Sequence, residues 1–325
     1  ALRTAMLSPT LDTVARLYAL GEFDHDHHPF EFLNRIDHVR LVHAFGWAER
    51  LKFLKSAWPI LTGGGKLDDG LAFEGQQGQR PGKDRDDTSL IHFHYDLSNR
   101  FYELFLDPEM VYSCAYFERD GMDISEAQTA KLDLICRKLR LAPGLKLFDP
   151  GCGWGGLVCH AAKNYGVEAH GVTLAKEQFD YCQAKIARLG LQDKVKVELR
   201  DYRSVTEAEA YDRIAQIEMF EHVGLDNHDA HFRHVHHLLK PRGLYLHQAS
   251  TRRATPDLSR FRKATIYQQF ATRYIFPGGE LDYIGLTVTN LERLGFEVHD
   301  VENMREHFQK TCEAWANRLW DNREE

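Results

Sequence analysis

Residues 146–156 read KLFDPGCGWGG, and this stretch decides the fold. A short apolar run ends in Asp149 and is followed at once by glycines, which allow a backbone to turn sharply and to approach a ligand closely. The helix expected after them begins with unpaired backbone amides, which suit a polar ligand. The order strand, glycine loop, helix therefore predicts a ligand site at the end of a first parallel strand.

Downstream of this stretch, short apolar runs alternate with helical patterns, which is typical of a doubly wound α/β fold of Rossmann type. The predicted strands cover 146–149, 168–172, 194–199, 213–217 and 243–248. The predicted helices between them cover 156–164, 176–189 and 228–239.

Upstream, apolar residues recur at helical spacing, and a polar glycine-containing stretch follows them. We expect three parts: a helical accessory domain over 1–74, a linker over 75–87, and the α/β domain with a lid over 88–325. The aromatic-rich residues 88–120 are the predicted helical lid.

Composition limits the class of protein. The formal net charge of −7 argues against a nucleic-acid-binding protein, and the six scattered cysteines predict reduced thiols. The sequence has neither an apolar run long enough to span a membrane nor a pattern resembling a signal peptide, so we expect a soluble, cytoplasmic protein. The tract His25, His27 and His28 lacks a second ligand set, and we predict no metal.

The glycine loop favours S-adenosylmethionine (SAM) over a dinucleotide. Its spacing differs from GxGxxG, and the second strand ends in Gly171-Val172-Thr173-Leu174 without an acidic residue for a ribose. Asp149 suits a cationic or amine group of the ligand.

Several motifs occur in one order along the chain. They are HYDLSN at 94–99, YSCAYF at 112–117, GCGWGG at 151–156, FEHVG at 220–224 and IFPGG at 275–279, with Gln128 and Lys131 between the second and third. In these motifs the chain resembles the cyclopropane fatty acid synthases and their mycolic-acid relatives. The resemblance implies a Rossmann-like class I SAM-dependent methyltransferase with a small helical N-terminal region and a helical lid.

The resemblance also implies site residues. SAM, with S-adenosylhomocysteine (SAH) as its product, would contact Tyr112, Ser113, Asp149, Gly151, Gly153, Thr173, Leu174, Gln178, Asp201 and Tyr202. Catalytic roles would fall to Cys114, Glu221 and His247, and substrate contacts to Tyr95, Tyr274 and Phe308. The expected substrate is the cis double bond of an unsaturated phospholipid acyl chain. An alkene that accepts a methyl cation becomes a carbocation, so the site needs π-rich walls and a base.

Three positions depart from the family pattern. In cyclopropane synthases the base is thought to be a bound bicarbonate, and here Phe308 replaces a tyrosine that would hold it, while Gln248 follows His247 where the family usually has threonine. Glu218 stands where ring-forming members usually have glycine. We therefore interpret Glu218 as a built-in catalytic base, which resembles the branch that makes methyl- or methylene-branched lipids.

Three other functions remain open: a cyclopropane synthase that uses bicarbonate, a non-catalytic SAM-binding partner subunit, and methylation of a small natural product on oxygen or nitrogen. The basic segment 251–263 predicts contact with phospholipid headgroups, with Phe261 touching acyl chains, and so peripheral binding at the inner membrane face. A homo-oligomer and a downstream reductase or oxidase partner are also left open.

Overall fold

The computed structural model describes residues 97–325, together with 17–18, 21, 28, 31 and 90. The chain divides into two compact units, residues 1–74 with 264–274 and residues 75–263 with 275–325. In the first unit the structure describes α12 (Ile266–Tyr274). The predicted accessory domain and linker lie almost wholly outside the described residues, so these boundaries stay predictions.

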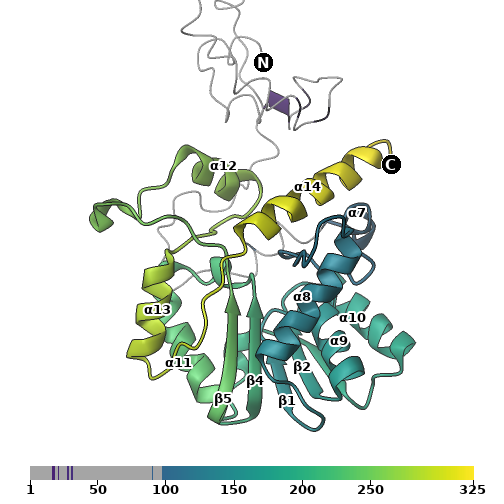
Figure 1. The fold of residues 1–325 in the computed structure, drawn as a ribbon, viewed down its shortest axis with the longest axis vertical. Coiled ribbons are helices and arrows are strands. Elements are labelled where there is room, and N and C mark those ends of the chain that lie inside the picture. The colour runs from purple at the N-terminus through teal and green to yellow at the C-terminus, as the bar shows by residue number, and fades with distance from the viewer. Residues whose placement is uncertain (1–16, 19–20, 22–27, 29–30, 32–89, 91–96) are drawn as a thin grey trace, which may run out of the picture. The chain divides into compact units, whose positions relative to one another are not determined.

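The second unit is built on a five-stranded parallel sheet (Figure 1). Its strands are β1 (Lys146–Asp149), β2 (Glu168–Thr173), β3 (Val195–Leu199), β4 (Tyr211–Ile217) and β5 (Leu239–Gln248), in the spatial order β3-β2-β1-β4-β5. β1 pairs with β2 on one side and with β4 on the other. The chain therefore changes direction across the sheet at β1, and ligands bind at such a switch point beyond the carboxyl ends of the strands. The predicted α/β fold is confirmed.

Helices cover both faces of the sheet. On one face lie α8 (Ile124–Lys138), α9 (Gly156–Tyr165) and α10 (Lys176–Leu189), which share a core with the strands around Leu147 and Val197. On the other face α11 (His228–Leu238) packs through Val235 against Phe148 and Ile214, and α13 (Ile284–Arg293) contacts α11. These buried apolar contacts hold the ends of β1 and β4 in place beneath the site.

Short helical turns fill the connections at the carboxyl edge of the sheet. They are η1 (Tyr202–Ser204), η2 (Phe220–His222), η3 (Leu225–Asn227) and η4 (Leu258–Arg260). Because each of the first two follows closely on a strand, η1 after β3 and η2 after β4, the side chains at these strand ends are brought to one edge.

α8 begins with a reciprocal cap. The Asp123 side chain accepts a hydrogen bond from the Glu126 amide at 2.8 Å, and the Glu126 side chain accepts one from the Asp123 amide at 3.2 Å. Of the predicted lid, residues 97–120 are described, and they contain one short helix, α7 (Asn99–Glu103). The segment that follows α7 packs against α14 (Arg305–Asp321), since the Ala115 amide donates to Thr311 Oγ1 at 3.0 Å. The lid segment is thus fixed between α8 and α14.

Among the residues that the structure describes, none of the helices combines the length and apolar character needed to cross a lipid bilayer.

Candidate functional site

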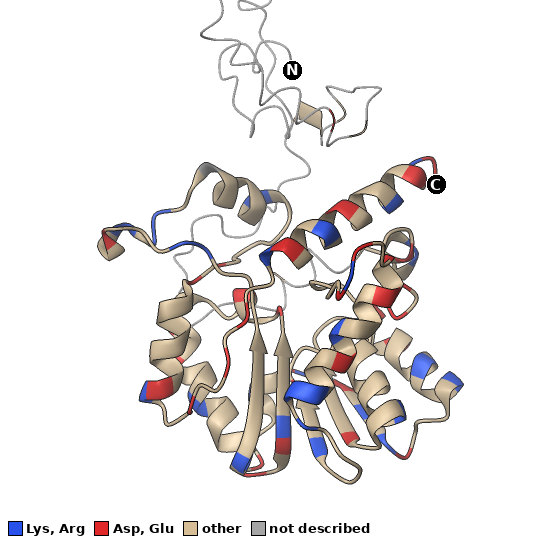
Figure 2. Cartoon of the chain, viewed as in Figure 1, with Lys and Arg blue, Asp and Glu red and all other residues tan. Residues whose placement is uncertain are grey.

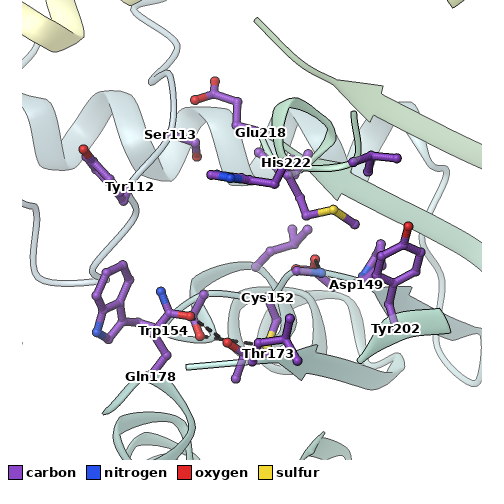
Figure 3. A pocket seen from close by; sticks show the side chains of 18 of the residues that line it. Tyr112, Ser113, Asp149, Cys152, Trp154, Thr173, Gln178, Tyr202, Glu218 and His222 are labelled. Atoms are coloured by element: carbon purple, nitrogen blue, oxygen red, sulfur yellow. Dashed lines mark hydrogen bonds between the residues drawn. The ribbon is translucent and has the colours of Figure 1, made fainter. Parts of the chain in front are cut away.

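The loop between β1 and α9 lines a cavity of about 520 Å³ (Figure 3). Gly153 has φ +52°, in the left-handed region that glycine adopts without strain. At Gly151 a Cβ atom would lie 2.8 Å from Met219 Cγ, so the end of β4 leaves no room for a side chain there. Both glycines are therefore required by the shape of the cavity wall.

Asp149 lies under this loop and is 3% exposed. Its Oδ1 accepts a hydrogen bond of 3.3 Å from the Gly151 amide. Burial raises the pKa of Asp149 to about 7, although that hydrogen bond and the charge of Lys131 oppose the rise. A cationic group of a ligand would stabilise the ionised form of this carboxyl group, and that predicted pairing stays a prediction.

The end of β2 supplies a second polar pair. Thr173 Oγ1 donates a hydrogen bond of 2.7 Å to Gln178 Oε1, and both residues are buried (Figure 3). The Gln178 side-chain amide group therefore keeps its two N–H donors for a ligand, since no described residue accepts from them. Leu174 lines the cavity beside them.

The end of β3 brings Asp201 and Tyr202 to the same cavity. Burial alone would raise the pKa of Asp201, but hydrogen bonds and charge from Arg203 bring it below its ordinary value. The Tyr202 hydroxyl lies 3.0 Å from His231 Nδ1. This end of the cavity is therefore polar and contains one ionised carboxylate.

Tyr112 and Ser113 form the wall opposite the glycine loop (Figure 3). Lys131 of α8 also lines the cavity. The Tyr112 ring packs against Tyr102 at a centroid distance of 5.6 Å. Lys131 Nζ donates a hydrogen bond of 2.8 Å to Ser113 Oγ, and burial lowers the pKa of Lys131 to about 8. The wall thus combines aromatic surface with one buried amine.

Glu218 directly follows β4 and lines the cavity (Figure 3). Its Oε1 accepts hydrogen bonds from the Cys114 amide at 2.9 Å and from Gln248 Nε2 at 2.8 Å. Burial raises the pKa of Glu218, while those two donors and Lys131 oppose the rise. Its φ is +49°, a conformation that costs a residue with a side chain about 1 kcal/mol. Strained residues of this kind cluster at functional sites.

Cys114, Glu221 and His247 do not line the cavity. Cys114 is 3% exposed and burial raises the pKa of its thiol to about 12, which makes it a poor nucleophile. It touches the site through its backbone amide alone, by the bond to Glu218.

Glu221 and His247 are half-buried and do not line the cavity either. Glu221 Oε1 accepts a hydrogen bond of 2.6 Å from the Ser250 amide, and its buried Oε2 has no hydrogen-bond partner among the residues that the structure describes. Burial raises the pKa of Glu221 to about 7. His247 Nδ1 lies 3.1 Å from the Tyr245 hydroxyl, and burial lowers the pKa of His247 to about 3. His247 is therefore a neutral, half-buried histidine, and the catalytic roles assigned to these residues stay predictions.

Of the three predicted substrate residues, the structure places only Phe308 relative to this cavity. Tyr95 lies outside the described residues. Tyr274 ends α12 in the first unit, and Phe308 is half-buried on α14 without lining the cavity. Their contacts with substrate stay predictions.

Two residues that matter here, Lys131 and Gln248, were not predicted as site residues. Gln128 and Lys131 are three apart on the buried side of α8, and a lysine in such a place is the signal that could have found it. Gln248 could have been found from its place at the end of a strand beside β4.

Comparison with known proteins agrees with this geometry. The family described as mycolic acid cyclopropane synthetase matches residues 82–325. A probable fatty acid methyltransferase of Pseudomonas putida is 38% identical over 235 residues, which are 72% of this chain and 59% of that protein. The chain thus spans less than two thirds of that relative's length.

Two further relatives are matched over most of their length. Methoxy mycolic acid synthase MmaA3 of Mycobacterium tuberculosis is 36% identical over 75% of this chain and 84% of its own. The crystal structure of mycolic acid cyclopropane synthase CmaA1 complexed with SAH and CTAB has a TM-score of 0.67 at 36% identity, covering 74% of this chain and 86% of that one.

Proposed function

The chain belongs to the mycolic acid cyclopropane synthetase family of SAM-dependent methyltransferases, and on that premise we propose that it methylates the cis double bond of an unsaturated phospholipid acyl chain to give a methyl- or methylene-branched product. Glu218 is the proposed base. The single observation that carries this proposal is the Glu218 carboxylate on the cavity wall, held by two hydrogen bonds to one of its oxygens.

The residues of the cavity fit SAM. Buried Asp149 suits the ammonium group of the methionine part, the glycine loop admits a ligand close to the backbone, and the free amide group of Gln178 suits a ribose hydroxyl. SAM supplies an electrophilic methyl group, which an alkene attacks without help from a strong base. The work left to this chain is to bind the reactants, exclude water and remove one proton.

Proton removal decides the product. When an alkene carbon gains CH₃, the neighbouring carbon becomes cationic. A hydride shift moves the charge to the carbon that bears the new methyl group, and loss of a proton from that methyl leaves a methylene branch. The acyl chain has then gained CH₂, and the proton is on the Glu218 carboxylate. A base attached to the backbone at a fixed point favours one proton over the others.

The substitution Glu218→Gln tests this assignment. It keeps shape and removes the base, so we expect turnover of unsaturated phospholipid to fall at least 100-fold while SAM binding stays within about threefold. Products would be measured by mass spectrometry of the acyl chains, with radiolabelled methyl transfer as the rate. Full turnover by the variant would show that Glu218 is not the base.

A second candidate function is cyclopropane synthesis with bicarbonate as base, which the similarity to cyclopropane synthase CmaA1 favours. The two are separated by the same assay in bicarbonate-depleted buffer. Our proposal expects undiminished turnover and a branched product, whereas loss of turnover that added bicarbonate restores, together with a ring product, would favour the second candidate.

Action at the inner face of a membrane is part of the proposal, and the segment 251–263 supports it. Figure 2 marks its lysine and arginine positions in blue. Arg253 and Lys263 are exposed and have no ion pair with any described residue, and Leu258 is 52% exposed. By contrast, Arg262 is paired with Asp226 at 2.6 Å.

The prediction that Phe261 touches acyl chains was wrong. Its side chain is 4% exposed, because it packs under Arg252 and against Tyr283. The surface proposed to face lipid is therefore Arg253, Leu258 and Lys263.

A methylene product still contains a double bond, so a reductase would be the class of partner that consumes it. Self-association of the chain can be tested by sedimentation.

A further inference from the structure

The two donors that hold Glu218 act on the same oxygen. The Cys114 amide and Gln248 Nε2 both donate to Oε1, at 2.9 and 2.8 Å. Oε2 accepts no hydrogen bond from the part of the chain that the structure describes. A carboxylate oxygen with two donors has less electron density to offer a proton, so the other oxygen is the better acceptor.

Gln248 also fixes the backbone of the same residue. Its carbonyl oxygen accepts a hydrogen bond of 2.7 Å from the Glu218 amide, directly after the β4–β5 pair Ile217 with Gln248. Glu218 therefore leaves the strand at a defined point, and its left-handed φ of +49° turns the chain there. One residue thus holds Glu218 both at its backbone and at its side chain.

Gln248 is well placed to hold the carboxylate without touching the reactants. It is half-buried in the strand next to β4 and does not line the cavity, whereas Glu218 does. An amide side chain donates to a carboxylate without carrying charge. It therefore orients Glu218 and favours its ionised form, yet adds no cation that would repel the sulfonium of SAM.

We propose that Gln248 is a positioning residue that presents Glu218 Oε2 to the cavity as the oxygen that takes the proton. This proposal rests on the proposed function, since it assigns Gln248 a role in the reaction through Glu218. Its consequences are a defined pH dependence and a defined choice of proton.

The substitution Gln248→Met tests it, because methionine has similar length and no N–H donor. We expect the acidic limb of the pH profile, the range in which turnover falls as Glu218 becomes protonated, to move up by about one pH unit. At a pH within that range turnover should fall about tenfold, since a hydrogen bond to a charged group is lost. The share of methylene product among the methylated chains should also change, while the KM for SAM stays within about threefold. Gln248→Asn keeps an amide but is too short to reach Oε1, and the same limb should move in the same direction.

Gln183→Met is the matched control. Gln183 Nε2 donates a hydrogen bond of 3.1 Å to the Val197 carbonyl oxygen, outside the cavity, so the variant loses a comparable bond with a structural role alone. Its pH limb and its product share should equal those of the parent protein. An equal shift in Gln183→Met, or an unchanged limb and product share in both Gln248 variants, would overturn the proposal.

Glu218→Gln, assayed beside these variants, separates the two ideas. If Glu218→Gln is inactive and the Gln248 variants behave as the parent, the base is right and the positioning role is wrong. If Glu218→Gln turns over at the parent rate, the base itself is wrong, whatever the Gln248 variants show.

Discussion

The ammonium group of Lys131 donates a hydrogen bond to the Ser113 hydroxyl on the cavity wall, at 2.8 Å, and has no other hydrogen-bond partner among the described residues. Lys131 is 2% exposed, and its charge interacts with Glu218 and Asp149. Burying a charged amine costs free energy unless opposite charges and hydrogen bonds compensate for its lost hydration.

Replacing Lys131 should therefore change the acidity of the site. In Lys131→Met the nearby positive charge is gone, so the pKa of Glu218 and of Asp149 should rise further, and ionisation should require a higher pH. We expect the acidic limb of turnover to move upward by about one unit. The measurement is methyl transfer at pH 5 to 9.

Lys185→Met is the control for buried lysine. Lys185 is 1% exposed and pairs with Glu109 at 2.6 Å, outside the cavity. Its replacement should lower the melting temperature without moving the pH limb. If the acidic limb of the pH profile is unchanged in Lys131→Met, an electrostatic role for Lys131 is excluded.

Binding of SAM should release a proton from Asp149. The pKa of Asp149 is raised to about 7 in the protein without ligand, and a cationic ammonium group stabilises the carboxylate, so the bound form has the lower pKa. Affinity should then be constant above pH 7 and fall about tenfold per unit below it, until the pKa of the bound form is reached.

Calorimetry in two buffers of different ionisation enthalpy measures this proton directly. At pH 6 we expect close to one proton released by the parent protein and none by Asp149→Asn, which should also bind more weakly. The same proton count in both proteins would show that another group titrates.

The left-handed conformation of Glu218 predicts a difference between two variants. Glu218→Gly relieves the backbone strain and Glu218→Ala does not, so the glycine variant should be more stable by about 1 kcal/mol. Glu209 has φ +51° on an exposed loop, and Glu209→Gly against Glu209→Ala should give a similar difference with full activity. Denaturant unfolding measures all four, and equal stability of the Glu218 pair would contradict the conformation.

The exposed cations of segment 251–263 predict a charge-dependent attachment to vesicles. Substituting Arg253 and Lys263 by serine should lower the partition coefficient onto anionic phospholipid vesicles, measured by sedimentation at low salt, by roughly 30-fold, at about 1 kcal/mol for each charge. Lys146→Ser with Lys194→Ser removes two exposed cations from the opposite edge of the sheet, and should leave binding unchanged. Equal effects of the two pairs would attribute binding to net charge instead.

The sequence predicted the central part of the fold closely, because buried parallel strands are continuous apolar runs. β1 and α10 match their predicted bounds, whereas β5 begins four residues earlier than predicted. There α11 ends at Leu238 and Leu239 already pairs with Tyr211, but the register shifts before Leu244 pairs with Arg213, and Arg242 between them has φ +64°. α8 was not predicted, since buried Gln128 and Lys131 interrupt its apolar pattern.

The sequence predicted correctly those cavity residues that lie at or just after the ends of strands. Asp149, Thr173, Asp201 and Glu218 each end or follow a strand, and parallel strands bring such residues to one edge. Cys114, Glu221 and His247 were expected at the site, yet none of them lines the cavity; they contact Met304, Ser250 and Tyr245 in that order. The contacts of Cys114 with Met304 and of Glu221 with Ser250 join segments that are far apart in the sequence, so spacing alone could not show them.

The φ angle of +49° at residue 218 lies in the region that glycine adopts freely, and Glu218 occupies it directly after the last β4–β5 pair, Ile217 with Gln248. A glycine codon becomes a glutamate codon by a single nucleotide change. If residue 218 supplies the proton acceptor, as proposed, one such substitution would add or remove that acceptor and change the product while the surrounding strands stay in place.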